Sequence, residues 1–164
     1  MLILNETSAI AIVLVEPQIP QNTGNIMRLC ACIGARLYLI GALGFNLQDK
    51  FLKRAGMDYL DRVEPVHLAS FEALDAELPG WQFVYCTTRA QQSHWQWQYH
   101  PNTALVFGSE TTGLPAAFIA EHQASCIRIP MRTGERSLNL ANSVSIVAYE
   151  ALRQLSTNES VLFC

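Results

Sequence analysis

A short apolar run near the N-terminus, residues 9–15 (AIAIVLV), constrains the fold more than any other feature of the chain. The run is rich in β-branched residues, which favours a strand buried on both faces of a parallel sheet. It is the longest uninterrupted apolar stretch, and it is far shorter than the roughly 20 residues that a membrane span needs. Pro17 and Pro20 follow it and end the strand.

The rest of the chain alternates strand and helix patterns. Further strands are predicted at residues 36–40, 82–87, 103–107 and 125–129, with a short helical or irregular piece at 51–56. Helices are predicted at about 23–33 (capped by Thr23 and ended by Gly34), at 71–78, from Pro115 onward, and at about 138–155. This alternation predicts an α/β fold with a mostly parallel sheet flanked by helices.

Length and charge narrow the class of protein. The 164 residues suit one domain, and a hydrophobic fraction of 50% is ample for a packed core. A net charge of −3 argues against a protein that holds nucleic acid by bulk charge. Of the eleven basic residues all but Lys50 and Lys53 are arginines, which suit phosphate and carboxylate, although codon bias is the simpler explanation of the count alone.

The cysteines and histidines indicate neither disulfides nor a metal site. The five cysteines form no CxxC pair, and the four histidines have no metal-ligand spacing with them. The N-terminus lacks the basic start and long apolar core of a signal peptide. We therefore expect a cytoplasmic protein with reduced thiols, no metal and no membrane partner.

Polar residues follow the predicted strands, where α/β sheets bind ligands. In residues 16–34, Asn22, Asn25 and Arg28 lie three apart and form a stripe at the start of a helix. Beside the positive helix N-terminus, such a stripe can hold a phosphate or a ribose. A turn, a cap or a solvated helix position explains each residue alone, but three in a row favour function.

A second segment, residues 108–115 (GSETTGLP), places two glycines around a carboxylate and three hydroxyls. Glycine permits close backbone approach, and exposed amides there can receive a nucleoside. The spacing matches neither a Walker A loop nor a GxGxxG motif. Glu110 taken alone is equally well explained as a capping or turn acid.

The third segment, residues 127–152, places four polar residues at the first turns of the last helix: Ser137, Asn139, Asn142 and Ser143. Their amides and hydroxyls can hydrogen-bond bases and ribose. A helix cap explains Ser137 but not the whole cluster. The loop at 87–89 (TTR) is unremarkable by itself.

Together these segments resemble the SPOUT (α/β-knot) class of RNA methyltransferases, and most closely the TrmL subfamily of tRNA (cytidine/uridine-34)-2′-O-methyltransferases. The three family motifs match residues 20–34, 105–115 and 127–150, and the subfamily element RAG-x-DY matches residues 54–59 (RAGMDY). The resemblance implies one SPOUT domain over residues 1–164, with residues 1–8 as an N-terminal extension and a cofactor-binding trefoil knot at about 82–155. It also implies an obligate homodimer that uses S-adenosylmethionine and acts on the tRNA anticodon stem-loop.

Carried over by position, the resemblance implies three sets of site residues. The cofactor-binding set is Cys86, Thr87, Gly108, Glu110, Ile129, Met131, Ser137 and Leu138. The catalytic set is Arg28, Asn25, Glu110, Ser137 and Asn139. The RNA-binding set is Asn22, Arg28, Lys53, Arg54 and Arg132, and a wider basic face of the dimer would add Lys50, Arg128 and Arg136.

The implied reaction is 2′-O-methylation of the wobble ribose of tRNA, at cytidine or modified uridine 34. Arg28 is proposed in this family as the base, but a guanidinium pKa above about 12 favours phosphate binding and stabilisation of a developing alkoxide. Glu110 would hold the cofactor's ammonium or order the knot loop.

Three questions stay open at this point. The target can instead be another tRNA or rRNA position, or the protein can be a non-catalytic RNA-binding member of the fold. The aromatic residues within 93–100 (SHWQWQYH) would stack on unpaired bases, or lie at a partly buried edge or dimer surface.

Overall fold

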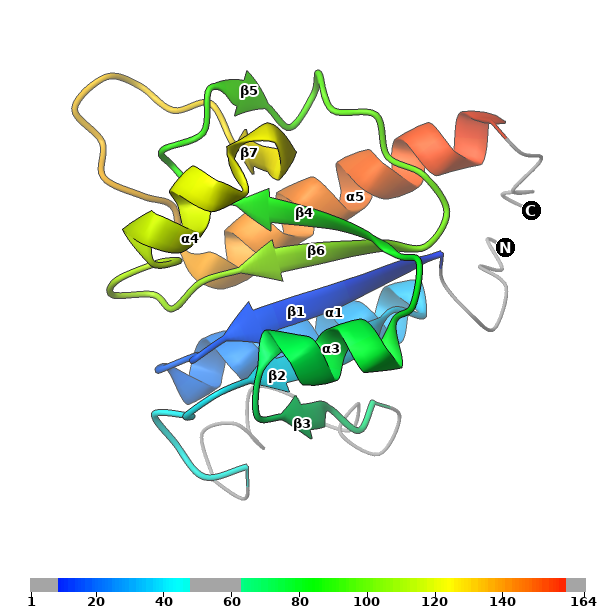
Figure 1. The fold of residues 1–164 in the computed structure, drawn as a ribbon, viewed down its shortest axis with the longest axis vertical. Helices are drawn as coiled ribbons and strands as arrows, with labels where there is room; N and C mark the ends of the chain where they lie inside the picture. The colour runs from blue at the N-terminus through cyan, green and yellow to red at the C-terminus, as the bar shows by residue number, and fades with distance from the viewer. Residues whose placement is uncertain (1–8, 48–62, 159–164) are drawn as a thin grey trace.

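A seven-stranded parallel sheet forms the centre of the computed structural model, which describes residues 9–47 and 63–158 (Figure 1). The strand order is β3-β2-β1-β6-β4-β7-β5. The strands are β1 Ile10–Val15, β2 Arg36–Ile40, β3 Val66–Leu68, β4 Gln82–Cys86, β5 Gln92–Ser93, β6 Thr103–Phe107 and β7 Cys126–Arg128. The predicted α/β class is thereby confirmed.

The apolar run at residues 9–15 forms β1, as predicted. This strand pairs in parallel with β2 on one side and β6 on the other, so that Val13 lies opposite both Tyr38 and Val106. Every residue of β1 except Val15 is buried. Because side chains alternate along a strand, Ile12 and Leu14 face one side of the sheet and Val13 faces the other.

Within residues 9–47 and 63–158, two helices cover each face of the sheet (Figure 1). On the first face, α1 (Pro20–Ile33) and α5 (Leu140–Asn158) pack against each other and against Ile12 and Leu14. On the second face, α3 (Phe71–Glu77) and α4 (Ala116–Glu121) pack against Val13 and its neighbours. A 3-10 turn, Gln123–Ser125, then leads into β7. The sheet therefore separates two apolar cores.

The start of α1 differs from the prediction. The helix begins at Pro20, because a proline in the first turn needs no amide hydrogen and has a helical φ. Thr23 therefore lies inside the helix, where it is fully buried and caps nothing. The predicted end is confirmed, since Gly34 adopts a left-handed φ of 69° and its amide donates to the carbonyl of Cys30.

The caps of the last two helices also differ. The side-chain oxygen of Asn139, not of Ser137, accepts a hydrogen bond from the amide of Asn142 at 3.2 Å, so Asn139 caps α5. Pro115 stands one position before the first residue of α4. The sequence also misses β3 and β5, because strands of three and two residues carry no readable period. The piece at 51–56 lies outside the described residues.

Candidate active site

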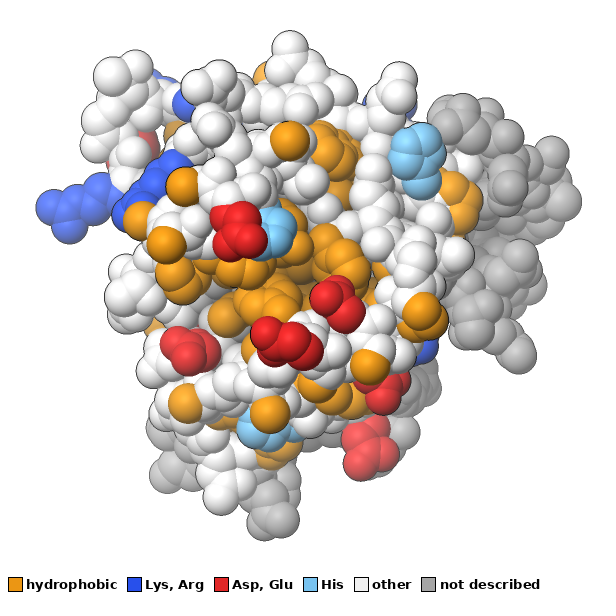
Figure 2. Space-filling model, in the orientation of Figure 1, with side chains coloured by type: hydrophobic (Ala, Val, Ile, Leu, Met, Phe, Trp, Pro, Cys, Tyr) orange, Lys and Arg blue, Asp and Glu red, His pale blue; other side chains and the backbone are white. Residues whose placement is uncertain are grey.

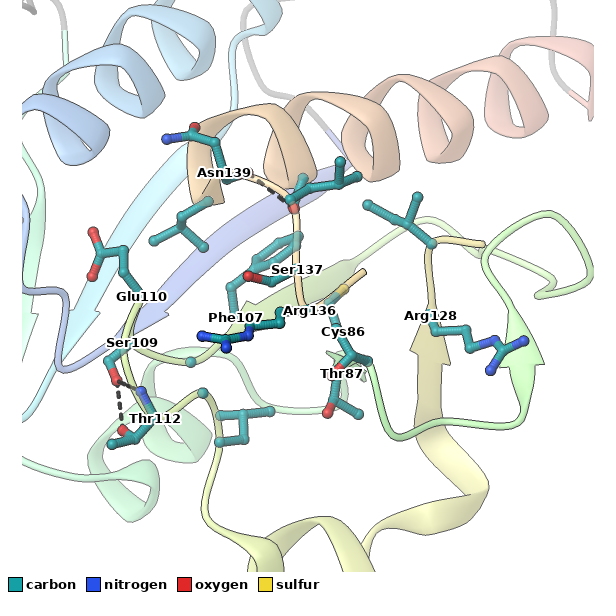
Figure 3. A pocket seen from close by; sticks show the side chains of 18 of the residues that line it. Cys86, Thr87, Phe107, Ser109, Glu110, Thr112, Arg128, Arg136, Ser137 and Asn139 are labelled. Atoms are coloured by element: carbon teal, nitrogen blue, oxygen red, sulfur yellow. Dashed lines mark hydrogen bonds between the residues drawn. The ribbon is translucent and has the colours of Figure 1, made fainter. Parts of the chain in front are cut away.

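The carboxyl ends of β4, β6 and β7 border a cavity of about 630 Å³ (Figure 3). Three loops supply most of its wall: the loop after β4, the loop after β6, and the segment from β7 to α5. The cavity brings together all eight residues of the predicted cofactor-binding set: Cys86, Thr87, Gly108, Glu110, Ile129, Met131, Ser137 and Leu138.

The loop after β6 folds back tightly on Gly108. A Cβ atom added at Gly108 would lie 2.2 Å from both the carbonyl carbon of Gly113 and the amide nitrogen of Leu114. The amide of Gly113 donates to the carbonyl of Ser109 at 2.9 Å, and the hydroxyls of Ser109 and Thr112 are hydrogen-bonded at 2.7 Å. Only glycine therefore fits at position 108 in this loop.

Glu110 is fully engaged by the start of α1. Its Oε2 accepts a hydrogen bond from the amide of Gln18 at 2.8 Å. Its Oε1 accepts from the amide of Ile19 at 3.2 Å and from the side-chain amide of Asn22 at 3.0 Å. The carboxylate thus satisfies amides that a helix start leaves unpaired, at the end where negative charge is favoured.

Asn22 continues this network to the third loop. Its Oδ1 accepts a hydrogen bond from Nδ2 of Asn139 at 2.9 Å. Asn22 is only 5% exposed, whereas Asn139 is exposed, so their hydrogen bond runs from the buried helix start to the surface. Glu110, Asn22 and Asn139 therefore connect the loops that follow β6, β1 and β7.

Not every predicted site residue lines the cavity. Asn25 and Arg28 are exposed on α1, one and two turns beyond Asn22, and are absent from the cavity wall. Arg132 is exposed on the segment before α5 and is also absent from the wall. Lys50, Lys53, Arg54 and the RAGMDY element lie outside the described residues.

Three arginines line the cavity: Arg89, Arg128 and Arg136. In Figure 3 the side chain of Arg136 extends across the cavity, whereas that of Arg128 points away from it. Sequence reasoning missed Arg89, although its position just after a strand was the available signal. Because amide donors occupy both carboxylate oxygens of Glu110, the guanidiniums of Arg89 and Arg136 make the wall suited to an anionic group.

Part of the wall is apolar, and these apolar residues were not among the predicted site residues. Phe107, Ile127, Leu140 and Val147 contribute to it from β6, β7 and α5. Burial raises the pKa of the Cys86 thiol well above its ordinary value, so the group is neutral at pH 7 and adds to this apolar surface.

The aromatic segment does not form one exposed face. Trp95 is 63% exposed, Trp97 is half-buried and Tyr99 is only 2% exposed. Gln154 of α5 holds the segment, because it accepts from the amide of Tyr99 at 3.3 Å and donates to the carbonyl of Trp97 at 3.0 Å. Of the three rings, Trp95 is the most available to a partner.

The burial of His94 in this segment predicts that the free energy of unfolding depends on pH. The residue is buried, and burial lowers the pKa of its imidazole, against smaller opposite effects of Arg128 and Glu150. The unfolded chain then binds the proton more readily, so the folded state loses stability as the pH falls below about 6.5. Urea unfolding at pH 7.5 and pH 5.5 measures this loss. A His94→Gln variant should show a smaller difference between the two pH values, and an equal difference would contradict the assignment.

Other kinds of site are not found among the described residues. No group of three or more His, Cys, Asp or Glu side chains there could hold a metal ion. Cys30, Cys32, Cys86 and Cys126 are free thiols. None of the described helices is both long enough and apolar enough to span a membrane.

Comparison with known proteins matches residues 9–149 to the SpoU rRNA Methylase family. The tRNA (cytidine(34)-2'-O)-methyltransferase of Yersinia pestis is 47% identical over 151 residues, which cover 88% of this chain and 93% of the relative. The protein of the same name from Methylovorus glucosotrophus is 45% identical over 147 residues, covering 87% and 94%.

Solved structures show the same similarity. A structure described as giving structural insights into the 2-OH methylation of C/U34 on tRNA matches with a TM-score of 0.85 and 40% identity, over 90% of this chain and 97% of that one. The SpoU methyltransferase AviRb from Streptomyces viridochromogenes, in complex with the cofactor AdoMet, matches with a TM-score of 0.78 and 25% identity, over 88% and 57%. The family match includes every residue that lines the cavity.

Proposed function

This chain belongs to the SpoU rRNA methylase family, and on that premise we propose that it methylates the 2′-hydroxyl of the wobble ribose, position 34, of tRNA. One observation carries the proposal: relatives that are 45–47% identical over nearly nine-tenths of the chain are named tRNA (cytidine(34)-2'-O)-methyltransferases. The wobble ribose is therefore favoured over other RNA targets and over a non-catalytic role.

The methyl donor in this proposal is S-adenosylmethionine, which becomes S-adenosylhomocysteine. The volume of about 630 Å³ lies within the range of roughly 300–1,000 Å³ typical of small-molecule sites. Apolar side chains such as Ile127 and Leu140 suit an adenine ring, and the glycine-rich turn at 108–113 lets backbone amides approach a ligand closely. The predicted cofactor-binding set, with Cys86 and Ser137 on separate loops, would hold the molecule.

The donor determines what the protein must do. When bound, S-adenosylmethionine supplies a methyl group on a sulfonium, which is already activated for transfer. The protein therefore has to align the hydroxyl with that group and accommodate the loss of its proton. We assign the positioning to the network of Glu110, Asn22 and Asn139, because it fixes three cavity loops relative to one another. With its oxygens occupied by amides, Glu110 orders the loop rather than binding the ammonium of the cofactor.

Arginine side chains would hold the RNA. Arg136 and Arg89 line the cavity and can bind the phosphates next to the target ribose. Arg28, on the exposed side of α1, is assigned to bind the adjacent phosphate and stabilise the alkoxide, while an oxygen of that phosphate takes the proton. Asn25, one turn earlier, is assigned to the same RNA contact, and Lys53, Arg54 and Arg132 to the flanking nucleotides.

An Arg28→Lys substitution tests this role. We expect kcat/KM to fall roughly 10- to 100-fold, because hydrogen bonds to charged groups contribute about 1.5–3 kcal/mol and lysine loses the bidentate geometry. Single-turnover rates measured between pH 6 and 9 should keep the same pH profile. Near-normal turnover would contradict the bidentate contact, and a shifted pH profile would indicate a titrating base at this position.

A homodimer is the second part of the proposal. Along the outer side of α5, Asn142, Ile146 and Tyr149 are exposed at helical spacing, and the neighbouring α1 exposes Arg28 and Cys32. Burying this surface in a second copy would place Arg28 at the subunit boundary. Sedimentation velocity should show a dimer, and a monomer that retains full activity would contradict the arrangement.

The chain path is compatible with the expected knot at about 82–155. α5 follows β7, yet it packs beneath β6 and β1, so the connecting segment has to pass back across the sheet. We propose a single domain of this type that works on tRNA in the cytoplasm.

The decisive experiment is to methylate total tRNA with tritiated S-adenosylmethionine and map the labelled nucleoside. We expect the label only on the ribose of nucleotide 34. A label at any other position would contradict the proposed target. Absence of both label and S-adenosylhomocysteine binding would instead support the non-catalytic alternative.

A further inference from the structure

A second hollow lies on the opposite face of the sheet from α1 and α5. It has a volume of about 510 Å³ and lies between α3 and α4, where β1 and β2 end at Val15 and Ile40. We call it the acidic groove. Figure 2 shows this face, with apolar side chains in the hollow and carboxylates around it.

The floor of the acidic groove is aromatic. Phe71 and Phe118 are half-buried and stacked at 4.7 Å, and Phe118 stacks on His122 at 4.2 Å. Tyr85 packs edge-on against Phe118 at 5.0 Å from the core side. The floor therefore presents partly exposed ring surface that a ligand with apolar groups can cover.

Three exposed carboxylates form the rim: Glu16, Glu72 and Glu121. None of them makes an ion pair within the part of the chain that the structure describes. The described lining also holds no Lys or Arg, and its one potential cation, His122, donates from Nδ1 to the carbonyl of Phe118. Among the described residues that line the groove, the negative charge of the rim is therefore not balanced by a Lys or Arg.

The local backbone conformation positions Glu16 on the rim. This residue has a φ of 48°, a left-handed value that is uncommon for a residue other than glycine. Its amide is fixed by the carbonyl of Ile40 at 2.8 Å, and a Cβ atom added at Gly41 would lie 3.0 Å from its side chain. Gly41 therefore leaves the space in which this carboxylate reaches the groove.

The negative charge of the acidic groove disfavours RNA and favours a positively charged partner. The cavity at the ends of β4, β6 and β7 is lined by arginines, whereas the acidic groove, at the ends of β1 and β2, would repel phosphate. We propose that the acidic groove is a docking site for a segment of another protein that carries basic side chains beside apolar ones. Its cationic groups pair with the three glutamates while its apolar side chains cover Phe71 and Phe118.

The experiment uses fluorescence anisotropy with a labelled 12-residue peptide that alternates arginine and leucine. We expect saturable binding that weakens about tenfold when salt is raised from 50 to 300 mM. A triple variant, Glu16→Gln, Glu72→Gln and Glu121→Gln, should bind about tenfold more weakly. The matched control Glu64→Gln, which changes an exposed glutamate outside the groove, should bind like the unchanged protein.

Two further peptides separate the contributions. A peptide with serine in place of leucine should bind at least about tenfold more weakly, because the aromatic floor is then uncovered. A peptide with glutamate in place of arginine should not bind. Equal binding by the triple variant, or by the serine peptide, would overturn the proposal. A change of oligomeric state in the triple variant would overturn it too, since the groove would then be an interface between copies.

Discussion

Replacing Gly108 by alanine should abolish cofactor binding. The added Cβ atom would lie 2.2 Å from two backbone atoms of residues 113 and 114, and backbone cannot rotate away as a side chain does. The loop after β6 has to open, which displaces Ser109 and Glu110 from their places in the cavity wall. We expect a loss of about 3 kcal/mol in the free energy of unfolding, at the upper end of what overpacking costs. Affinity for S-adenosylhomocysteine should fall at least about 100-fold.

A Gly113→Ala variant is the matched control. Gly113 has a φ of 67°, so alanine is strained there by about 1 kcal/mol, but an added Cβ atom has no atom within 4 Å. It should melt roughly 2–4 °C lower and retain most of its cofactor affinity. Differential scanning calorimetry and isothermal titration with S-adenosylhomocysteine measure both quantities. Equal behaviour of the two variants would contradict close backbone approach as the reason that glycine is needed at position 108.

The buried part of the fold could be predicted because buried strands and helix faces leave a recognisable pattern of apolar residues in the sequence. The run at 9–15 and the residues 104–107 are apolar throughout, and they form most of β1 and β6, two inner strands that are covered on both faces. The edge strands β3 and β5 could not be predicted, since three and two residues are positioned by their neighbours rather than by their own pattern. The predicted helix starts were wrong for a similar reason. Thr23 and Ser137 can cap a helix, but α1 begins at Pro20 and Asn139 caps α5.

The sequence could predict which residues lie near the cavity, but not how they are arranged around it. Parallel strands bring their carboxyl ends to one edge, so loops distant in sequence were expected to meet there. Which member of a polar stripe enters the cavity depends on helix rotation, and the structure places Asn22 in the wall and Asn25 outside it. Arg89 was missed because three polar residues after a strand have no pattern of their own.

The small net charge of the chain does not reveal that positive and negative side chains gather at two different sites. Arginines line the cavity at the ends of β4, β6 and β7, and glutamates surround the acidic groove at the ends of β1 and β2. The net charge of −3 is a sum over the whole chain and does not show this local separation. A weakly acidic chain can therefore bind an anionic substrate at one site and a cationic segment at another, because each interaction depends on charges within about one Debye length.

Replacing Glu110 by glutamine should weaken both stability and catalysis. The carboxylate accepts three hydrogen bonds, through two oxygens, from donors that cannot accept. Glutamine replaces one oxygen with an NH₂ group, which has to face one of those donors. We expect the free energy of unfolding to fall by about 2 kcal/mol and kcat/KM to fall roughly 100-fold. Urea unfolding and initial rates on tRNA measure the two effects.

The alternative role of Glu110 gives a different result. If its carboxylate held the ammonium of the cofactor, Glu110→Gln would weaken S-adenosylhomocysteine binding while stability stayed unchanged. A double-mutant cycle with Asn139→Ala, which also removes the cap of α5 at a cost of about 1 kcal/mol, tests the network directly. Both residues bind Asn22, so we expect the losses in stability to be less than additive by at least about 0.5 kcal/mol. Strict additivity would mean that the loops are fixed independently and that the network does not couple them.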